Sequence, residues 1–177
     1  MPALMTAEEL LYHDEPNKRT ELVRGVLEVH EPPGGRHGRI ASELGRRLGN
    51  HVLGLGLGAV YADSGFTLWR NPDTVRAPDV AFVRAERLLT PEPIGYPELG
   101  PDLVVEVLSP HDRPGKVLAK VADWLTAGTR LVWVIDPQRR HARVYRADGT
   151  EATVLETQAL EGEDVIPGFV LELGPVL

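Results

Sequence analysis

Cysteine is absent from the 177-residue chain, and several other features of common protein classes are scarce or missing. Without cysteine there are no disulfides, thiolate nucleophiles or cysteine-based zinc sites, so a metal ion would need carboxylate, imidazole or backbone ligands. Purely apolar runs span only a handful of residues, which argues against a membrane-spanning helix. Residues 1–6 show neither a charged leader nor an apolar signal core, and we therefore expect a cytoplasmic protein.

The chain is also poor in positive charge, with 26 acidic and 19 basic side chains and a formal net charge of −7. Proteins that bind polyanions in bulk gain affinity when Lys and Arg release counterions, so this balance argues against that class. Two arginine-rich stretches, residues 36–47 and 139–146, could still contact phosphates, although we interpret them as solvated, salt-bridging surfaces. Aromatic residues make up only 6% of the sequence, which leaves few platforms for stacking sugars.

Local patterns predict an N-terminal helix and hairpin followed by a longer helix. Thr6 and Glu9 have the spacing of a capping box, in which each side chain bonds the backbone N–H of the other residue. Residues 21–30 predict a tight hairpin. Apolar residues at helical spacing predict an amphipathic helix that begins at His37 and ends near Gly54.

Two apolar strands are predicted at 103–108 and 131–136, on either side of an amphipathic helix. This order is typical of a parallel crossover, in which helices bury the strands. Residues 75–83 predict a further strand. We therefore predict an α/β fold of mixed (α+β) type, with a central mixed β-sheet flanked by α-helices. It would form a single domain over residues 1–177 with a core at about 37–146.

Glu106 is the most unusual residue of the sequence because it lies inside the apolar strand 104–108. Burying a charged carboxylate without partners costs several kcal/mol. An edge strand with Glu106 on a wet face would avoid this cost. However, the strand is apolar on both faces, which favours a central position in which Glu106 has a partner or a ligand.

Asp79 is a second acid between apolar neighbours. Pro78 removes one ladder donor and suits an edge strand or a bulge, so a solvated acid is an alternative. If the strands that carry the two acids pair, their backbones lie about 4.8 Å apart, and Asp79 and Glu106 could share a divalent cation such as Mg²⁺. Asp102 begins the Glu106 strand about 13 Å away along the chain, which is too far for the same ion.

Lys120 and Lys116 are four residues apart on the predicted helix and therefore share one of its faces. A solvated helix surface would explain both. Because this helix directly follows the Glu106 strand, Lys120 could instead lie over the end of that strand and stabilise charge on a phosphate or orient a water molecule. Glu21, at the start of the hairpin, is a candidate third carboxylate.

The order of these residues resembles the PD-(D/E)XK nuclease superfamily, in which an Asp and a Glu-x-Lys motif lie on adjacent strands of a mixed sheet. Here Asp79 is followed by Glu106 and then by a nearby lysine. More narrowly, the chain is similar to the Uma type of bacterial restriction-endonuclease-like proteins. The matching stretches, which cover most of the chain, are 21–25, 37–40, 77–80, 101–110, 120–137 and 166–169.

This resemblance implies a restriction endonuclease-like fold and roles for four residues. Asp79 and Glu106 would bind Mg²⁺ or Mn²⁺, Lys120 would be catalytic and Glu21 would assist. The chain departs from the superfamily motif at Leu108, which stands two residues after Glu106 where the motif has a lysine. In Uma-type proteins the lysine has moved to the following helix, which here corresponds to Lys120.

The residues and the resemblance together predict a Mg²⁺-dependent endonuclease that hydrolyses phosphodiester bonds in nucleic acid, with DNA as the expected substrate. A homodimer would suit cleavage of both strands of a duplex, which often uses two-fold symmetry. The negative charge and Leu108 leave an alternative, a catalytically inactive nuclease-fold module that binds nucleic acid or a protein partner. A glycosidase with Asp79 and Glu106 as paired carboxylates is a third interpretation, but it gives Lys120 no role.

Overall fold

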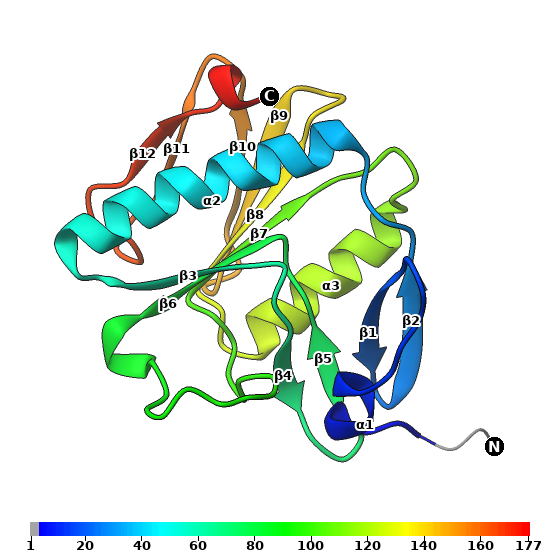
Figure 1. The fold of residues 1–177 in the computed structure, drawn as a ribbon. Helices are drawn as coiled ribbons and strands as arrows, with labels where there is room; N and C mark the ends of the chain where they lie inside the picture. Colours follow the sequence, from blue (N-terminus) through cyan, green and yellow to red (C-terminus); the bar gives the residue numbers. More distant parts are fainter. Residues whose placement is uncertain (1–3) are drawn as a thin grey trace.

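The computed structural model describes residues 4–177, which form helices packed on β-sheets (Figure 1). Residues 1–3 lie outside the described part, and they belong to the N-terminal stretch on which the expectation of no signal sequence partly rests. None of the helices in the described range is long and apolar enough to cross a membrane.

The described elements follow the mixed order of helices and strands that the sequence predicts. The helices are α1 (Ala7–Leu11), α2 (Gly35–Leu55) and α3 (Pro114–Thr126), with 3-10 turns η1 (Ala85–Arg87) and η2 (Gly174–Val176). The first strands are β1 (Arg19–Val23), β2 (Val26–His30), β3 (Gly58–Ala62), β4 (Phe66–Trp69), β5 (Thr74–Arg76) and β6 (Val80–Arg84). The later strands are β7 (Leu103–Val107), β8 (Leu131–Asp136), β9 (His141–Arg146), β10 (Glu151–Leu155), β11 (Ala159–Glu161) and β12 (Val170–Glu172).

The central sheet has six strands in the order β10-β9-β8-β7-β6-β3. Strands β7 and β8 are parallel and joined through α3, whereas the other neighbours are antiparallel. The predicted crossover and the predicted mixed sheet are therefore confirmed. Because β7 lies between β6 and β8, the interpretation of Glu106 as a residue of an edge strand is wrong.

Helices α2 and α3 cover opposite faces of this sheet. Alternate residues of a strand point to opposite sides, so neighbouring residues of one strand pack against different helices. Val105 and Trp133 belong to the core under α2, whereas Val104 and Val132 belong to the core under α3. The apolar stripe predicted on α2 is buried and consists of Ile40, Leu44, Leu48 and Val52. Each face of β7 is thus dry along most of the strand.

A second, antiparallel sheet has the order β2-β1-β5-β4 and packs on α1. Its β1–β2 hairpin turns through Arg24 and Gly25, whose φ angles are 50° and 78°. Positive φ at both turn residues is typical of the two-residue turn that matches strand twist. A Cβ on Gly25 would also lie 2.7 Å from the Leu4 side chain, so glycine fits both the turn and the packing.

The single strand predicted over residues 75–83 is wrong. The structure divides it into β5 of the second sheet and β6 of the central sheet, with the break at Ala77 and Pro78. Pro78 has no N–H to donate to a ladder, which explains why neither strand includes it. The change of sheet places Asp79 where the two sheets meet, beside the β1–β2 hairpin.

Asp102, just before β7, has a structural role at the end of the strand remote from Glu106. Its side chain is 2% exposed, accepts a hydrogen bond from the backbone N–H of Arg84 at 2.9 Å and pairs with Arg87 at 2.8 Å. These contacts tie the beginning of β7 to the end of β6.

We expect Asp102→Ala to lower the free energy of unfolding by about 1–3 kcal/mol, because the N–H of Arg84 loses its acceptor. Urea denaturation followed by circular dichroism measures this change. Asp102→Asn keeps an oxygen acceptor and should lose less, so it is the matched control. An alanine variant as stable as the wild-type protein would contradict the assignment.

Candidate active site

Asp79 and Glu106 occupy facing positions at one end of the central sheet. Strands β6 and β7 are antiparallel, and their register pairs Val80 with Val105. Asp79 directly precedes Val80 and Glu106 directly follows Val105, so the two acids lie next to this pair. Facing residues of antiparallel strands have Cα atoms about 4.5–5.5 Å apart. The strand pairing that the sequence predicts therefore brings the two acidic positions side by side.

Two residues of α3 hold the carboxylate of Glu106. Its Oε1 accepts a hydrogen bond from Trp124 Nε1 at 2.8 Å, and its Oε2 accepts one from Lys120 Nζ at 3.0 Å. Lys120 and Trp124 are four residues apart and so share one face of the helix. The amphipathic pattern predicts Trp124 only as a residue of the apolar stripe, whereas the structure also gives its indole N–H a polar partner.

Lys120 connects Glu106 of the central sheet to Glu21 of the hairpin. Its Nζ lies 2.9 Å from Glu21 Oε1 and donates to the backbone oxygen of Ala77 at 3.2 Å. Burial alone would lower the pKa of Lys120, but the carboxylates of Glu106 and Glu21 outweigh burial and raise the pKa. The side chain is therefore an ammonium ion at neutral pH, fixed by three oxygen acceptors.

Burial is the main influence on the carboxyl group of Glu106. Burial raises the pKa of Glu106 to about 7, and the charges of Asp79 and Glu21 act in the same direction. The Lys120 ammonium and the Trp124 hydrogen bond oppose this rise without cancelling it. A carboxyl group with this pKa exchanges its proton near neutral pH, which is a common property of residues in functional sites.

Asp79 is held by donors from three other parts of the chain. Its Oδ2 accepts a hydrogen bond from the N–H of Val107 at 2.7 Å and lies 3.2 Å from His37 Nε2, on the first turn of α2. Its Oδ1 lies 3.4 Å from the Arg19 guanidinium, which also pairs with Asp63. Burial would raise the pKa of Asp79, but these donors outweigh it and lower the pKa, so the carboxylate is ionised.

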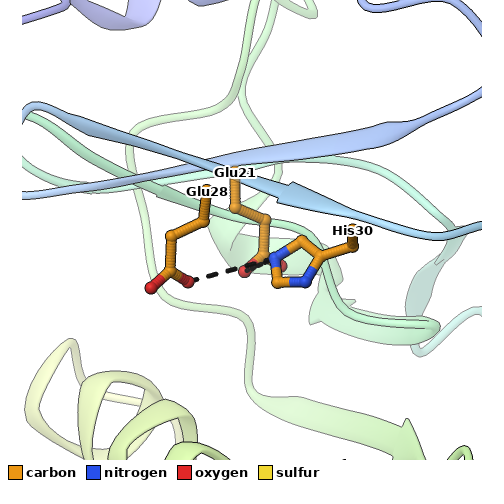
Figure 2. A group of neighbouring side chains, drawn as sticks. All are labelled: Glu21, Glu28 and His30. Atoms are coloured by element: carbon orange, nitrogen blue, oxygen red, sulfur yellow. Dashed lines mark ion pairs between the residues drawn. The ribbon is translucent and has the colours of Figure 1, made fainter. Parts of the chain in front are cut away.

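A second group of ligand-type side chains lies on the hairpin. Within residues 4–177, Glu21, Glu28 and His30 form the one trio whose candidate ligand atoms lie within 4.8 Å of one another. Figure 2 shows the three side chains projecting to the same side of the hairpin, with His30 Nε2 at 3.7 Å from Glu21 and 3.9 Å from Glu28. By composition alone, this trio is a possible metal site.

The carboxylates of this trio are already paired with cations. The buried Arg76 donates to Glu21 at 2.8 Å and to Glu28 at 3.1 Å, and Lys116 binds Glu28 at 2.8 Å. Burial would raise the pKa of Glu21, but Lys120, His30 and Arg76 together hold it well below its usual value. With its charge compensated in this way, the trio is better described as an ion-pair network than as a metal site.

The structure brings together all four residues that the sequence singles out as site candidates. Glu106, Lys120 and Glu21 are linked by direct ion pairs, and Asp79 accepts a hydrogen bond from the N–H of Val107, the residue after Glu106. Asp79 and Glu106 have no direct contact, but their charges interact.

Four further residues of this region are not predicted from the sequence: Arg19, His37, Arg76 and Trp124. Arg76 carries the same signal as Glu106, a charged residue between apolar neighbours of a strand, and could have been found by it. The other three have no comparable signal, because their partners come from elements far away in the chain.

Carboxylate oxygens such as those of Asp79 and Glu106 are the ligand type that a hard divalent cation takes. Each carboxylate offers about four lone-pair positions, so capacity remains beside the hydrogen bonds described above. Mg²⁺ and Mn²⁺ take such ligands, commonly one or two carboxylates with water and phosphate oxygens. The raised pKa of Glu106 comes mainly from its burial, and the charges of Asp79 and Glu21 add to it, so a bound cation would favour the ionised form.

Comparisons with known proteins agree with this fold. A solved structure from Anabaena variabilis ATCC 29413, described as "a putative nuclease belonging to DUF820", has a TM-score of 0.84 and 22% sequence identity. The alignment covers 97% of this chain and 97% of that chain. None of the curated proteins matches the chain. At this identity the structural likeness establishes the fold, which confirms the predicted fold class.

The family comparison extends over almost the whole sequence. The model of the Uma2 family, described as "Putative restriction endonuclease", matches residues 6–174. This match confirms the resemblance seen in the sequence motifs: the chain belongs to the Uma2 family.

Proposed function

We propose that the protein is a divalent-metal-dependent nuclease that cleaves DNA at the site formed by Asp79, Glu106, Lys120 and Glu21. The observation that carries the proposal is the contact of Lys120 with Glu106, 3.0 Å long, beside Asp79 at the end of β7. An Asp, a Glu and a lysine in one place are the residue types of the nuclease superfamily motif, even though the lysine comes from α3. Family membership supports the same activity.

Each residue has a role that follows from its contacts. Asp79 and Glu106 would hold Mg²⁺ or Mn²⁺, which when bound supplies Lewis-acid stabilisation of charge on the scissile phosphate. Lys120 places a fixed positive charge next to the same point, where it would stabilise the developing negative charge of the transition state. Glu21 keeps Lys120 in position from the hairpin side.

The alternative is a nuclease-fold module that binds nucleic acid or a protein without cleaving it. Arg19 and Lys120 already lie on the two acids, as would be expected if protein cations replaced the metal. Metal affinity separates the two functions. The single domain over residues 1–177, the homodimer and the cytoplasmic location stay predictions from the sequence.

We expect Asp79→Asn and Glu106→Gln each to abolish nicking of supercoiled plasmid and to weaken Mn²⁺ binding at least about tenfold, since even outer-shell partners contribute about 10–100-fold to metal affinity. Isothermal titration calorimetry and gel assays measure the two effects. His30→Gln tests the neighbouring trio as the alternative metal site and should leave the Mn²⁺ affinity unchanged. Nicking that survives both acid substitutions would contradict the site, and a loss of Mn²⁺ confined to His30→Gln would move the metal to the trio.

The affinity for metal should rise with pH across the pKa of Glu106. Below about pH 7 the carboxyl group holds a proton that the cation must displace, whereas above this value the carboxylate is free. We therefore expect Mn²⁺ to bind about tenfold more tightly at pH 8 than at pH 6, because one proton is released per ion. Calorimetry in matched buffers tests this. Equal affinities at the two pH values would show that Glu106 is not a ligand.

In Lys120→Met, Mn²⁺ binding should require a higher pH than in the wild-type protein, and cleavage should be slower. Removal of the ammonium disfavours the charged form of Glu106, so its pKa rises further and metal binding moves to higher pH. At a pH where metal is fully bound, we expect kcat to fall by about 10²–10³, as for the loss of one preorganised transition-state donor. Lys116→Met, on the same helix but 74% exposed, is the matched control. An unchanged profile and rate in Lys120→Met would exclude the proposed role.

A further inference from the structure

A cleft of about 620 Å³ lies between α2 and β3 and extends to Asp79. Arg19, His37 and Asp79 line one end of it, so the cleft is continuous with the candidate active site. Farther along, small residues of α2 such as Ala41 and Gly49 form one wall. Its volume lies within the range of about 300–1,000 Å³ that is usual for small-molecule pockets.

The helical wall is hollowed by glycines that the fold itself does not require. A glycine inside a helix costs about 1 kcal/mol relative to alanine. Yet a Cβ added at Gly38 or Gly49 would meet no atom within 4 Å, and one at Gly45 would meet Val80 only at ordinary contact distance. These glycines therefore leave open space along this wall of the cleft.

Polar groups at the active-site end of the cleft are suited to a ligand that carries a phosphate. The Arg19 guanidinium is 28% exposed and lies against Asp79. His37 is only 9% exposed and borders the cleft, with its Nε2 directed at Asp79. Strand β3 pairs only with β6, so the backbone groups of its other edge are free of sheet partners. The cleft thus offers a cation at its mouth and hydrogen-bonding groups along one side.

We propose that this cleft binds the unpaired nucleobase next to the scissile phosphate, with Arg19 contacting the phosphate between the base and the metal site. The inference rests on the proposed function, because Asp79 places the phosphate at the mouth of the cleft. A base is flat, has apolar faces and carries polar groups at its edge, which suits small apolar walls beside a free strand edge. Because a paired base cannot enter, the substrate is single-stranded or locally opened DNA.

Filling the cleft with a bulky side chain tests this inference. Gly49→Phe places a ring in the open space, and Gly54→Phe puts the same ring on the exposed end of α2 outside the cleft. Two fluorescein-labelled probes, a thymidine hexanucleotide and a hexamer of abasic sugar-phosphates, are titrated in Ca²⁺ buffer and followed by fluorescence anisotropy. The two probes share the backbone and differ only in their bases.

We expect the wild-type protein and Gly54→Phe to bind the thymidine probe about 5–100-fold more tightly than the abasic probe, the range that one enclosed base contributes. Gly49→Phe should bind both probes alike and should keep its Mn²⁺ affinity. Base discrimination that survives in Gly49→Phe would overturn the inference. A second result would also overturn it: Gly49→Phe changes the oligomeric state, as measured by light scattering, while probe binding stays unaltered. The cleft would then be an interface between copies of the chain.

These measurements also separate the inference from the proposed function. If the wild-type protein binds Mn²⁺ and nicks plasmid but does not prefer the thymidine probe, only the base subsite is wrong. If it neither binds Mn²⁺ nor nicks plasmid, but prefers the thymidine probe in a manner that depends on Gly49, the nuclease proposal fails and the cleft remains a nucleic-acid site. If it neither binds Mn²⁺ nor nicks plasmid and also binds neither probe, both are wrong.

Discussion

The burial of the Glu106 carboxylate in the middle of the central sheet is the constraint on which the site depends. A charge in this position is tolerated only when partners replace its lost hydration. Lys120 and Trp124 supply two of them from one face of α3, while burial still raises the pKa of Glu106 to about 7. The sheet therefore maintains a carboxyl group that is poised to exchange its proton for another cation.

The need of buried charges for partners also joins the two large sheets. Glu21 is buried on the hairpin and needs its own cations, which are Lys120 from α3 and Arg76 from β5. Arg76 in turn binds Asp123 of α3 at 2.7 Å. Hairpin, β5 and helix are thus tied together by charges that none of them could bury alone, and the packing of these elements places Lys120 on Glu106.

Asp79 occupies the point where the catalytic proposal and the cleft meet. The break at Pro78 ends the second sheet and begins β6, which brings Asp79 beside Glu106. The first turn of α2 then brings His37 to the same carboxylate, and the small residues of α2 continue from there into the cleft. One change of direction in the backbone therefore positions both the acid of the proposed metal site and the opening of the cleft.

The sequence by itself predicted most of the order of elements, the apolar character of β7 and the candidate acids Asp79 and Glu106, because period and apolar context are local properties, and the family resemblance added Lys120 as the expected catalytic lysine. The sequence left open whether Glu106 lay at an edge, and it missed Arg19 and His37. Only the tertiary structure decided these points, since a buried charge takes its partners from whichever elements pack against it. Such partners are distant in the chain, and no local pattern specifies them.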